Sequence, residues 1–137
     1  MAGKEWTGGC MCEAVRYRAF GEPVRIEVCH CRTCRRNTGS AFGIFVLFKA
    51  DDAVVEGEEE NVTTYRSSPE TTRHSCRHCG TPLFNRFEGH IDFHLGTLDE
   101  AERLSPQTEI WTARRLPWLS AFPDTSCSLY GSDEPRL

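Results

Sequence analysis

The sequence predicts a mainly β fold, built as one domain with one or two short helices. Short runs rich in β-branched and aromatic residues alternate with turns of Gly, Pro, Asn and Asp along most of the chain. Helical periodicity is scarce, and no internal repeat or low-complexity tract interrupts the pattern. A length of 137 residues suits a single domain, which we expect to span residues 1–137.

The expected strands follow from hydrophobic patterning. Residues 13–20 alternate, with Val15 and Tyr17 on one face and Arg16 and Arg18 on the other, as in a half-buried strand. Residues 42–48 are almost wholly apolar, which predicts a buried strand. Further short strands are expected at residues 24–28, 53–55, 62–66, 72–75, 83–87 and 91–95.

Two short helices are expected. One covers residues 31–37 and stops at Gly39, which occupies the position that a C-terminal cap would use. The other covers residues 99–104 and ends before a Ser-Pro pair. The acidic run within residues 51–60 is interpreted as a solvated loop.

Charge and hydropathy exclude several classes of function. The formal net charge is −4 and no basic patch is present, so neither nucleic acid nor a membrane surface is an expected partner. The first ten residues contain no apolar stretch that could act as a signal peptide. The longest apolar run, residues 41–48, is too short to span a bilayer. We therefore expect a cytoplasmic protein.

Eight cysteines in so short a chain point either to disulfides or to metal binding. A reducing cytosol argues against disulfides. The spacing argues the same way, because CxC, CxC and CxxC clusters place thiols too close along the chain to bridge distant segments. The cysteines are therefore interpreted as metal ligands, with zinc as the expected metal.

Two cysteine pairs are expected to form one closed zinc site. Cys10 and Cys12 would share one face of a bent strand, with the glycines at residues 8–9 supplying the backbone freedom for the bend. Cys76 and Cys79 form a CxxC knuckle followed by glycine. Together the pairs provide the four sulfurs of a structural zinc site, which would pin the first strand to a later hairpin.

A second cluster, Cys29, Cys31 and Cys34, offers three sulfurs within one short turn. Three ligands leave one coordination position for water or substrate, which distinguishes catalytic from structural zinc. The alternative is a fourth protein ligand, and the candidates are His30, His74, His78, His94 and Cys127. Of these, His30 is expected to point away from the metal, and Cys127 is expected to be a buried or free thiol.

The ordered series GGCMCEAVRY, CHCRTCRRNTGSAF and SCRHCGTPLF resembles the glutathione-dependent formaldehyde-activating enzyme family, which shares its domain with centromere protein V. The resemblance covers about residues 7–118 and implies a β-rich, Mss4-like domain with two zinc ions. It implies a structural role for Cys10, Cys12, Cys76 and Cys79, and a catalytic role for Cys29, Cys31 and Cys34.

The activity that the resemblance implies is that of a carbon-sulfur lyase, an S-(hydroxymethyl)glutathione synthase. The thiol of glutathione, or of a similar small thiol, would bind the open zinc position and attack formaldehyde or another small carbonyl. Zinc lowers the pKa of a thiol from its usual value of about 8.5, which makes the nucleophile available at neutral pH. Three cysteinates leave the zinc site anionic, which favours thiol activation over strong electrophilic catalysis.

Residues that follow the second cluster are candidates for binding the substrate. Arg35 and Arg36 could offset the anionic site or pair with a carboxylate of the substrate. Thr38, Gly39 and Ser40 could supply hydrogen-bond donors, although a helix stop explains them equally well.

Two other classes of function remain open. One is a zinc-stabilised binding module without turnover, since fold alone does not establish chemistry. The other is a thiol enzyme similar to methionine-sulfoxide reductases, with Cys127 as the nucleophile. Cys127 has a serine on either side and no flanking basic residue to lower its pKa, which argues against the second alternative.

Overall fold

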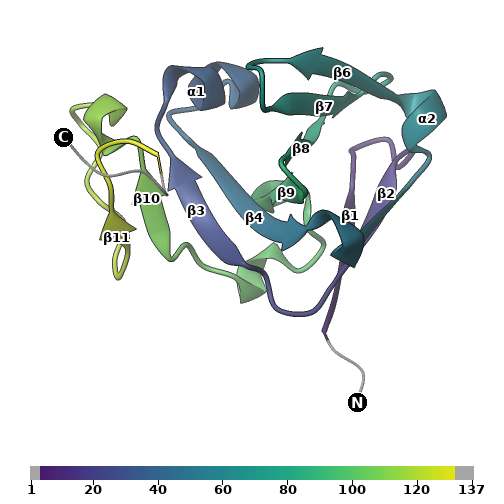
Figure 1. Cartoon of the computed structure of the whole chain (residues 1–137), viewed down its shortest axis with the longest axis horizontal. Helices are drawn as coiled ribbons and strands as arrows, with labels where there is room; N and C mark the ends of the chain where they lie inside the picture. Colours follow the sequence, from purple (N-terminus) through teal and green to yellow (C-terminus); the bar gives the residue numbers. More distant parts are fainter. Residues whose placement is uncertain (1–3, 132–137) are drawn as a thin grey trace.

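The computed structural model describes residues 4–131 as a β-rich fold (Figure 1). Over these residues, eleven strands form an eight-stranded and a three-stranded sheet, which confirms the mainly β prediction. Within the same range, no helix combines the length and apolar character needed to cross a membrane. The assignment of residues 1–137 to one domain stays a prediction.

The larger sheet is antiparallel except at one edge. Its strands, in spatial order, are β11 (Ser126–Cys127), β10 (Thr108–Ile110), β3 (Arg25–Cys29), β4 (Gly43–Lys49), β9 (His90–His94), β8 (Pro82–Phe87), β7 (Thr72–Cys76) and β6 (Val62–Arg66). Strand β10 pairs in parallel with both β3 and β11. The smaller sheet has the order β1 (Glu5–Gly9), β2 (Arg16–Phe20) and β5 (Ala53–Glu56). Strand β10 thereby lies between β3 and β11, the last strand of the chain that the structure describes.

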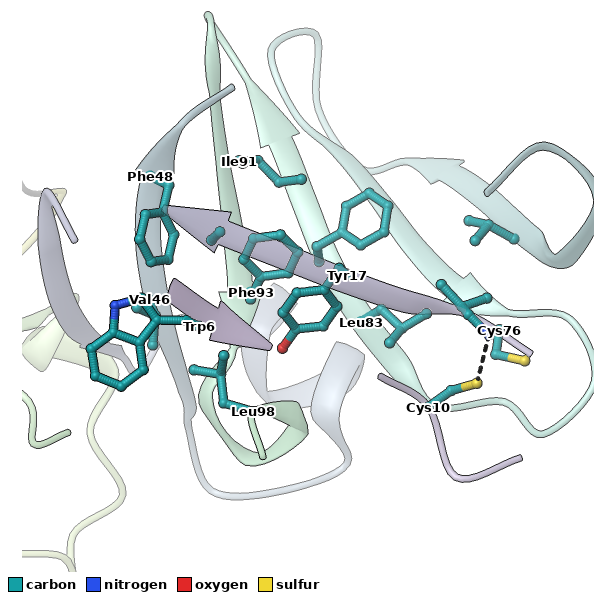
Figure 2. Close-up of a cluster of buried hydrophobic side chains, with 14 of the residues drawn as sticks. Trp6, Cys10, Tyr17, Val46, Phe48, Cys76, Leu83, Ile91, Phe93 and Leu98 are labelled. Atoms are coloured by element: carbon teal, nitrogen blue, oxygen red, sulfur yellow. Dashed lines mark hydrogen bonds between the residues drawn. The ribbon is translucent and has the colours of Figure 1, made fainter. Parts of the chain in front are cut away.

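Apolar side chains from the two sheets meet in one core (Figure 2). Tyr17 of β2 stacks on Phe93 of β9 with ring centroids 3.9 Å apart, and its hydroxyl lies 2.6 Å from Thr97 Oγ1. A Cβ atom on Gly8 would lie 2.4 Å from that hydroxyl. Position 8 therefore has to be glycine because a Cβ atom there would collide with Tyr17. The sequence suggested a different reason, the backbone freedom of glycine.

Helix α1 (Arg32–Thr38) confirms the helix expected at residues 31–37. Cys31 caps its N-terminus, because the Cys31 sulfur accepts a hydrogen bond from the Cys34 amide at 3.3 Å. Gly39 ends the helix in the left-handed conformation with φ of 68°, and its amide donates to the Arg35 carbonyl at 2.7 Å. The helix therefore lies one residue further along the chain than expected at each end, and it stops at Gly39 as predicted.

The expected helix at residues 99–104 is wrong, because only the 3-10 turn η3 (Ala101–Arg103) forms there. The few hydrogen bonds of a single α-helical turn do not offset the free-energy cost of helix nucleation unless tertiary packing stabilises the turn. The acidic run, expected as a loop, contains the one-turn helix α2 (Glu58–Asn61), in which Glu58 pairs with Arg86 at 2.9 Å. The other 3-10 turns are η1 (Ala50–Asp52), η2 (Leu95–Thr97) and η4 (Thr112–Arg114).

Seven of the expected strands occur within one residue of the expected bounds. The strand expected at residues 13–20 starts only at Arg16, because Glu13 has a φ of 65° and lies in a turn. Strands β1, β10 and β11 were not expected. Strand β1 is rich in glycine, and β10 and β11 are too short to show an alternating pattern.

Candidate functional site

Four sulfur atoms meet where the turn after β1 faces the β7–β8 turn. The sulfurs of Cys10, Cys12, Cys76 and Cys79 all lie within 4.8 Å of one another. The Cys10–Cys12 and Cys12–Cys76 sulfur pairs are each 3.7 Å apart. Four sulfurs arranged tetrahedrally about 2.3 Å from one zinc ion would be about 3.8 Å apart, so this donor set fits zinc. Cys10 and Cys76 lie at the edge of the core (Figure 2).

The sulfurs come from two turns and the end of β7 rather than from a bent strand, because Cys76 is the last residue of β7. Strand β1 ends at Gly9, so Cys10 and Cys12 lie beyond it in the turn. The amide of Val15 points at the Cys10 sulfur at 3.4 Å, and the amide of His78 points at the Cys76 sulfur at the same distance. Amide donors of this kind stabilise thiolates, as a metal centre requires.

Three further sulfurs meet where β3 leads into α1. Cys29 ends β3, Cys31 caps the helix and Cys34 lies in its first turn, and their sulfurs are within 4.8 Å of one another. Contacts with Cys31 and Cys34, together with burial, raise the pKa of Cys29. A third thiolate in this cluster therefore needs a cation, and the sulfur donor set fits zinc.

Within residues 4–131, no fourth Cys, His, Asp or Glu side chain joins the three sulfurs. The histidines considered as a fourth ligand have other partners: His30 bonds to Glu109, His74 to Thr64 and Thr72, His78 to Asn61 and His94 to Asn37. Burial, followed by the charge of Arg73, lowers the pKa of His94 to about 4, so that imidazole is neutral near pH 7.

The His30–Glu109 pair lies at the centre of a buried polar network. Both side chains are fully buried, and His30 Nε2 donates to Glu109 Oε1 at 2.9 Å. Arg115 also donates to Oε1, while the Phe122 amide and the Thr125 hydroxyl donate to Oε2. Burial alone would raise the pKa of Glu109, but these hydrogen bonds outweigh burial and lower it to about 2. The ionised carboxylate of Glu109 thus connects the segment that contains Arg115, Phe122 and Thr125 to His30, which lies between Cys29 and Cys31.

Cys127 belongs to neither cluster. Its side chain is exposed on β11, and Arg115 Nη2 lies 3.6 Å from its sulfur. Its immediate sequence neighbours gave no sign of this arginine, which lies twelve residues away.

A cleft of about 280 Å³ opens beside the three-sulfur cluster. Its walls include Cys29, Cys31 and Cys34, with Phe45 and Trp111 close to the sulfurs. Arg73 also lines the cleft, and its Nη1 lies 3.9 Å from the Cys34 sulfur while its Nε donates to Ser67 Oγ at 2.8 Å. A fixed guanidinium therefore faces the anionic cluster.

The rest of the cleft is lined largely by polar side chains that the sequence did not single out. Arg25 Nε donates to Glu27 Oε1 at 2.9 Å, and Asn85 Nδ2 donates to Asp92 Oδ1 at 2.8 Å. Burial raises the pKa of Asp92 to about 7, although the hydrogen bond from Asn85 acts in the opposite direction. A carboxyl group that titrates near neutrality in a cleft is a candidate functional group.

The predicted substrate residues lie elsewhere. Arg35, Arg36, Gly39 and Ser40 line a separate hollow of about 420 Å³, together with Arg32 and Leu116. Thr38 is used structurally, since its hydroxyl donates to the Cys34 carbonyl at 2.9 Å. None of these five candidates lines the cleft beside the three sulfurs. The substrate role for them stays a prediction, while the cation that faces the cluster is Arg73.

The fold and the site define a β-rich domain with two cysteine clusters that could hold metal ions, one with four sulfurs and one with three. Comparison with known families agrees with this class. The chain belongs to the glutathione-dependent formaldehyde-activating enzyme family, whose sequence model matches residues 5–114. The resemblance carried by the three cysteine motifs is thereby confirmed.

One curated protein and one solved structure are similar to this chain. A protein of Schizosaccharomyces pombe, named as an uncharacterized lyase, is 36% identical over 80 residues, which are 58% of this chain and 56% of that protein. The chain thus spans about half the length of this curated relative. A crystal structure of a Rhodobacter sphaeroides protein matches with a TM-score of 0.58 and 24% identity, covering 73% of this chain and 91% of that one. The structural match supports the fold.

Proposed function

We propose that the chain is a zinc-dependent enzyme of the carbon-sulfur lyase type, which adds a small thiol to formaldehyde or another small carbonyl. The observation that carries the proposal is the cleft beside Cys29, Cys31 and Cys34, where three sulfurs converge and no fourth metal-binding side chain of residues 4–131 joins them. Three protein ligands and an accessible face are the pattern of catalytic zinc. Family membership favours glutathione as the thiol and formaldehyde as the carbonyl.

The three cysteines would hold zinc in this proposal, and zinc would supply the lowered pKa that keeps a bound thiol ionised near pH 7. Arg73 would offset the negative charge of the cluster, because its guanidinium is already directed at Cys34. Trp111 and Phe45 would shield the sulfurs from part of the solvent. The four-cysteine cluster would hold a second zinc ion that stabilises the fold.

The proposed cellular setting is the cytoplasm, since seven clustered thiols need a reducing compartment to stay available to metal. A small thiol and a small carbonyl are the proposed partners.

An exchange experiment tests the proposed activity. Glutathione and formaldehyde also combine unaided, so the quantity to measure is the rate of exchange between the free reactants and their adduct by two-dimensional NMR, with and without zinc-loaded protein. We expect the protein to accelerate exchange and Cys31→Ser to remove the acceleration, while Cys127→Ser retains it. Exchange at the unaided rate with the zinc-loaded wild type would contradict the activity and favour a non-catalytic binding module.

A further inference from the structure

Trp111, the residue directly after β10, has an unfavourable backbone conformation. Its φ is 57°, in the left-handed region, where the Cβ atom comes too close to the following carbonyl oxygen and where a bulky residue is an outlier. Within residues 4–131, the other non-glycine residues with a positive φ are all acidic: Glu13, Glu88 and Asp124. A strained residue that also lines a cleft points to a functional constraint.

Main-chain hydrogen bonds hold Trp111 in this conformation. Its amide donates to the Tyr130 carbonyl at 2.9 Å, and its carbonyl accepts from the Arg114 amide at 2.9 Å. The amide of the next residue, Thr112, donates to the Ser128 carbonyl at 3.1 Å. The segment at residues 128–130 therefore fixes the backbone on which the tryptophan side chain stands and offsets the cost of the left-handed conformation.

The indole of Trp111 lies beside the three sulfurs. The side chain packs against the buried cluster of Cys29, Cys34 and Phe45, and it lines the cleft. The ring of Tyr130 supports the indole in an edge-to-face contact, with ring centroids 5.3 Å apart and planes at 82°. An indole held by its own backbone and by a second ring forms a rigid wall of the cleft.

This wall limits the room for a second reactant. In the proposed function, the cleft of about 280 Å³ receives both the thiol and the carbonyl compound. The thiol loses its proton, its sulfur bonds to the carbonyl carbon, the carbonyl π bond breaks, and the carbonyl oxygen takes up one proton. Any substituent on the carbonyl carbon has to fit between the bound thiol and the walls of the cleft. A rigid ring at that place discriminates by size.

We propose that Trp111 is a specificity-determining residue, which limits the size of the carbonyl compound that can react with a thiol at the Cys29, Cys31 and Cys34 cluster. This inference rests on the proposed function, because it assumes that the thiol and the carbonyl compound combine at that cluster. It goes further by assigning the selection between carbonyl compounds to one side chain and to the left-handed backbone that positions it.

Substitutions of Trp111 in the zinc-loaded protein test the inference. Trp111→Gly removes the ring and suits the left-handed φ, whereas Trp111→Phe keeps a smaller ring. The NMR exchange rate with glutathione and formaldehyde is compared with the rate for methylglyoxal, an aldehyde that carries an acetyl group. We expect Trp111→Gly to raise the methylglyoxal rate relative to the formaldehyde rate by about tenfold or more, and Trp111→Phe to raise it less. Trp118→Gly, the same change at a tryptophan that is 72% exposed and outside the cleft, should leave the ratio unchanged.

Tryptophan fluorescence gives a readout that needs no turnover. The chain has three tryptophans, of which Trp6 lies in the core and Trp111 lines the cleft. Titration of the zinc-loaded protein with glutathione alone should change the emission of the wild type and of Trp118→Phe. Trp111→Phe should lose this change, because the remaining tryptophans lie outside the cleft.

The outcomes separate the role of Trp111 from the proposed function. An unchanged ratio of the two rates in both Trp111→Gly and Trp111→Phe overturns the specificity role alone. An emission change that persists in full in Trp111→Phe also overturns it, because the indole would then lie away from the bound thiol. If Trp111→Gly does not fold, the ratio in Trp111→Phe decides the question. Exchange at the unaided rate with both carbonyl compounds in the zinc-loaded wild type contradicts the proposed function itself.

Discussion

The guanidinium of Arg73 lies 3.9 Å from the sulfur of Cys34, although the two residues are 39 positions apart in the chain. Arg73 and Cys76 both belong to β7, so one five-residue strand contributes a sulfur to the four-sulfur cluster and a cation to the three-sulfur cluster. A metal ion bound by the four sulfurs would hold in place the strand that carries the charge facing the three-sulfur cluster. This arrangement explains why a structural metal site would matter for activity at a different site.

Removing the charge of Arg73 should weaken thiol binding without unfolding the protein. Arg73→Gln is expected to lower the affinity for glutathione by about tenfold and to move the pH midpoint of thiol binding upward by about 1, because the bound thiolate loses the guanidinium that faces the cluster. Calorimetry across a pH series measures both effects. Arg73→Lys should restore part of the affinity, and Arg66→Gln should have no effect. An unchanged midpoint in Arg73→Gln would show that the guanidinium does not act on the bound thiol.

Breaking the four-cysteine cluster should unfold the protein, whereas breaking the other should not. Cys79→Ser is expected to reduce stability by about 3 kcal/mol or more and to lower the zinc content, because metal binding and folding are coupled there. Cys31→Ser should lower the zinc content from two to one per chain with a smaller change in melting temperature. Metal analysis and thermal unfolding report both quantities. Equal destabilisation by the two substitutions would contradict this division of roles.

Glu109 should stabilise the packing of the C-terminal segment. Glu109→Gln is expected to cost about 2–4 kcal/mol, because a fully buried carboxylate that accepts hydrogen bonds from four residues loses its charge beside Arg115. Chemical unfolding gives the free energy, and limited proteolysis shows whether cleavage now occurs beyond residue 104. Replacement of the exposed Glu102 by glutamine is the matched control. A change below about 0.5 kcal/mol would mean that the network contributes little.

Asp92 should destabilise the fold at neutral and alkaline pH. Its folded-state pKa of about 7 lies above the usual value of 3.8, so the folded state binds the proton more tightly than the unfolded state does. The protein therefore loses stability as the pH rises from about 4 through 7. Asp92→Asn lacks this penalty, and its stability relative to the wild type should increase by about 2 kcal/mol between pH 5 and pH 8. A difference that stays constant with pH would show that Asp92 does not titrate in this range.

A residue that lowers stability and lies in a cleft is typical of a functional site.

Local spacing was enough to predict the two cysteine clusters and helix α1. The CxC and CxxC motifs place sulfurs within a few residues of each other, and Gly39 marks the end of the helix whatever the rest of the chain does. Seven strands were also predictable, because runs of β-branched and aromatic residues stand between turn residues.

The side chains that furnish the cleft could not be predicted in this way. Arg73, Asn85 and Asp92 stand alone in the sequence, and only the register of β7, β8 and β9 brings them into one row. The pairing of His30 with Glu109 depends likewise on the parallel contact of β10 with β3. The pairing of short strands that are far apart in the sequence leaves no local pattern. The residues predicted to bind substrate therefore follow Cys34 directly, where the structure has a separate hollow.

The most direct test of the central claim is a crystal structure of the zinc-loaded protein soaked with glutathione. We expect zinc bound by Cys29, Cys31 and Cys34, with the glutathione sulfur about 2.3 Å from the metal as the fourth ligand. A fourth ligand supplied by the protein itself, or glutathione bound away from this cluster, would contradict the claim that the three cysteines form an open, thiol-binding zinc site.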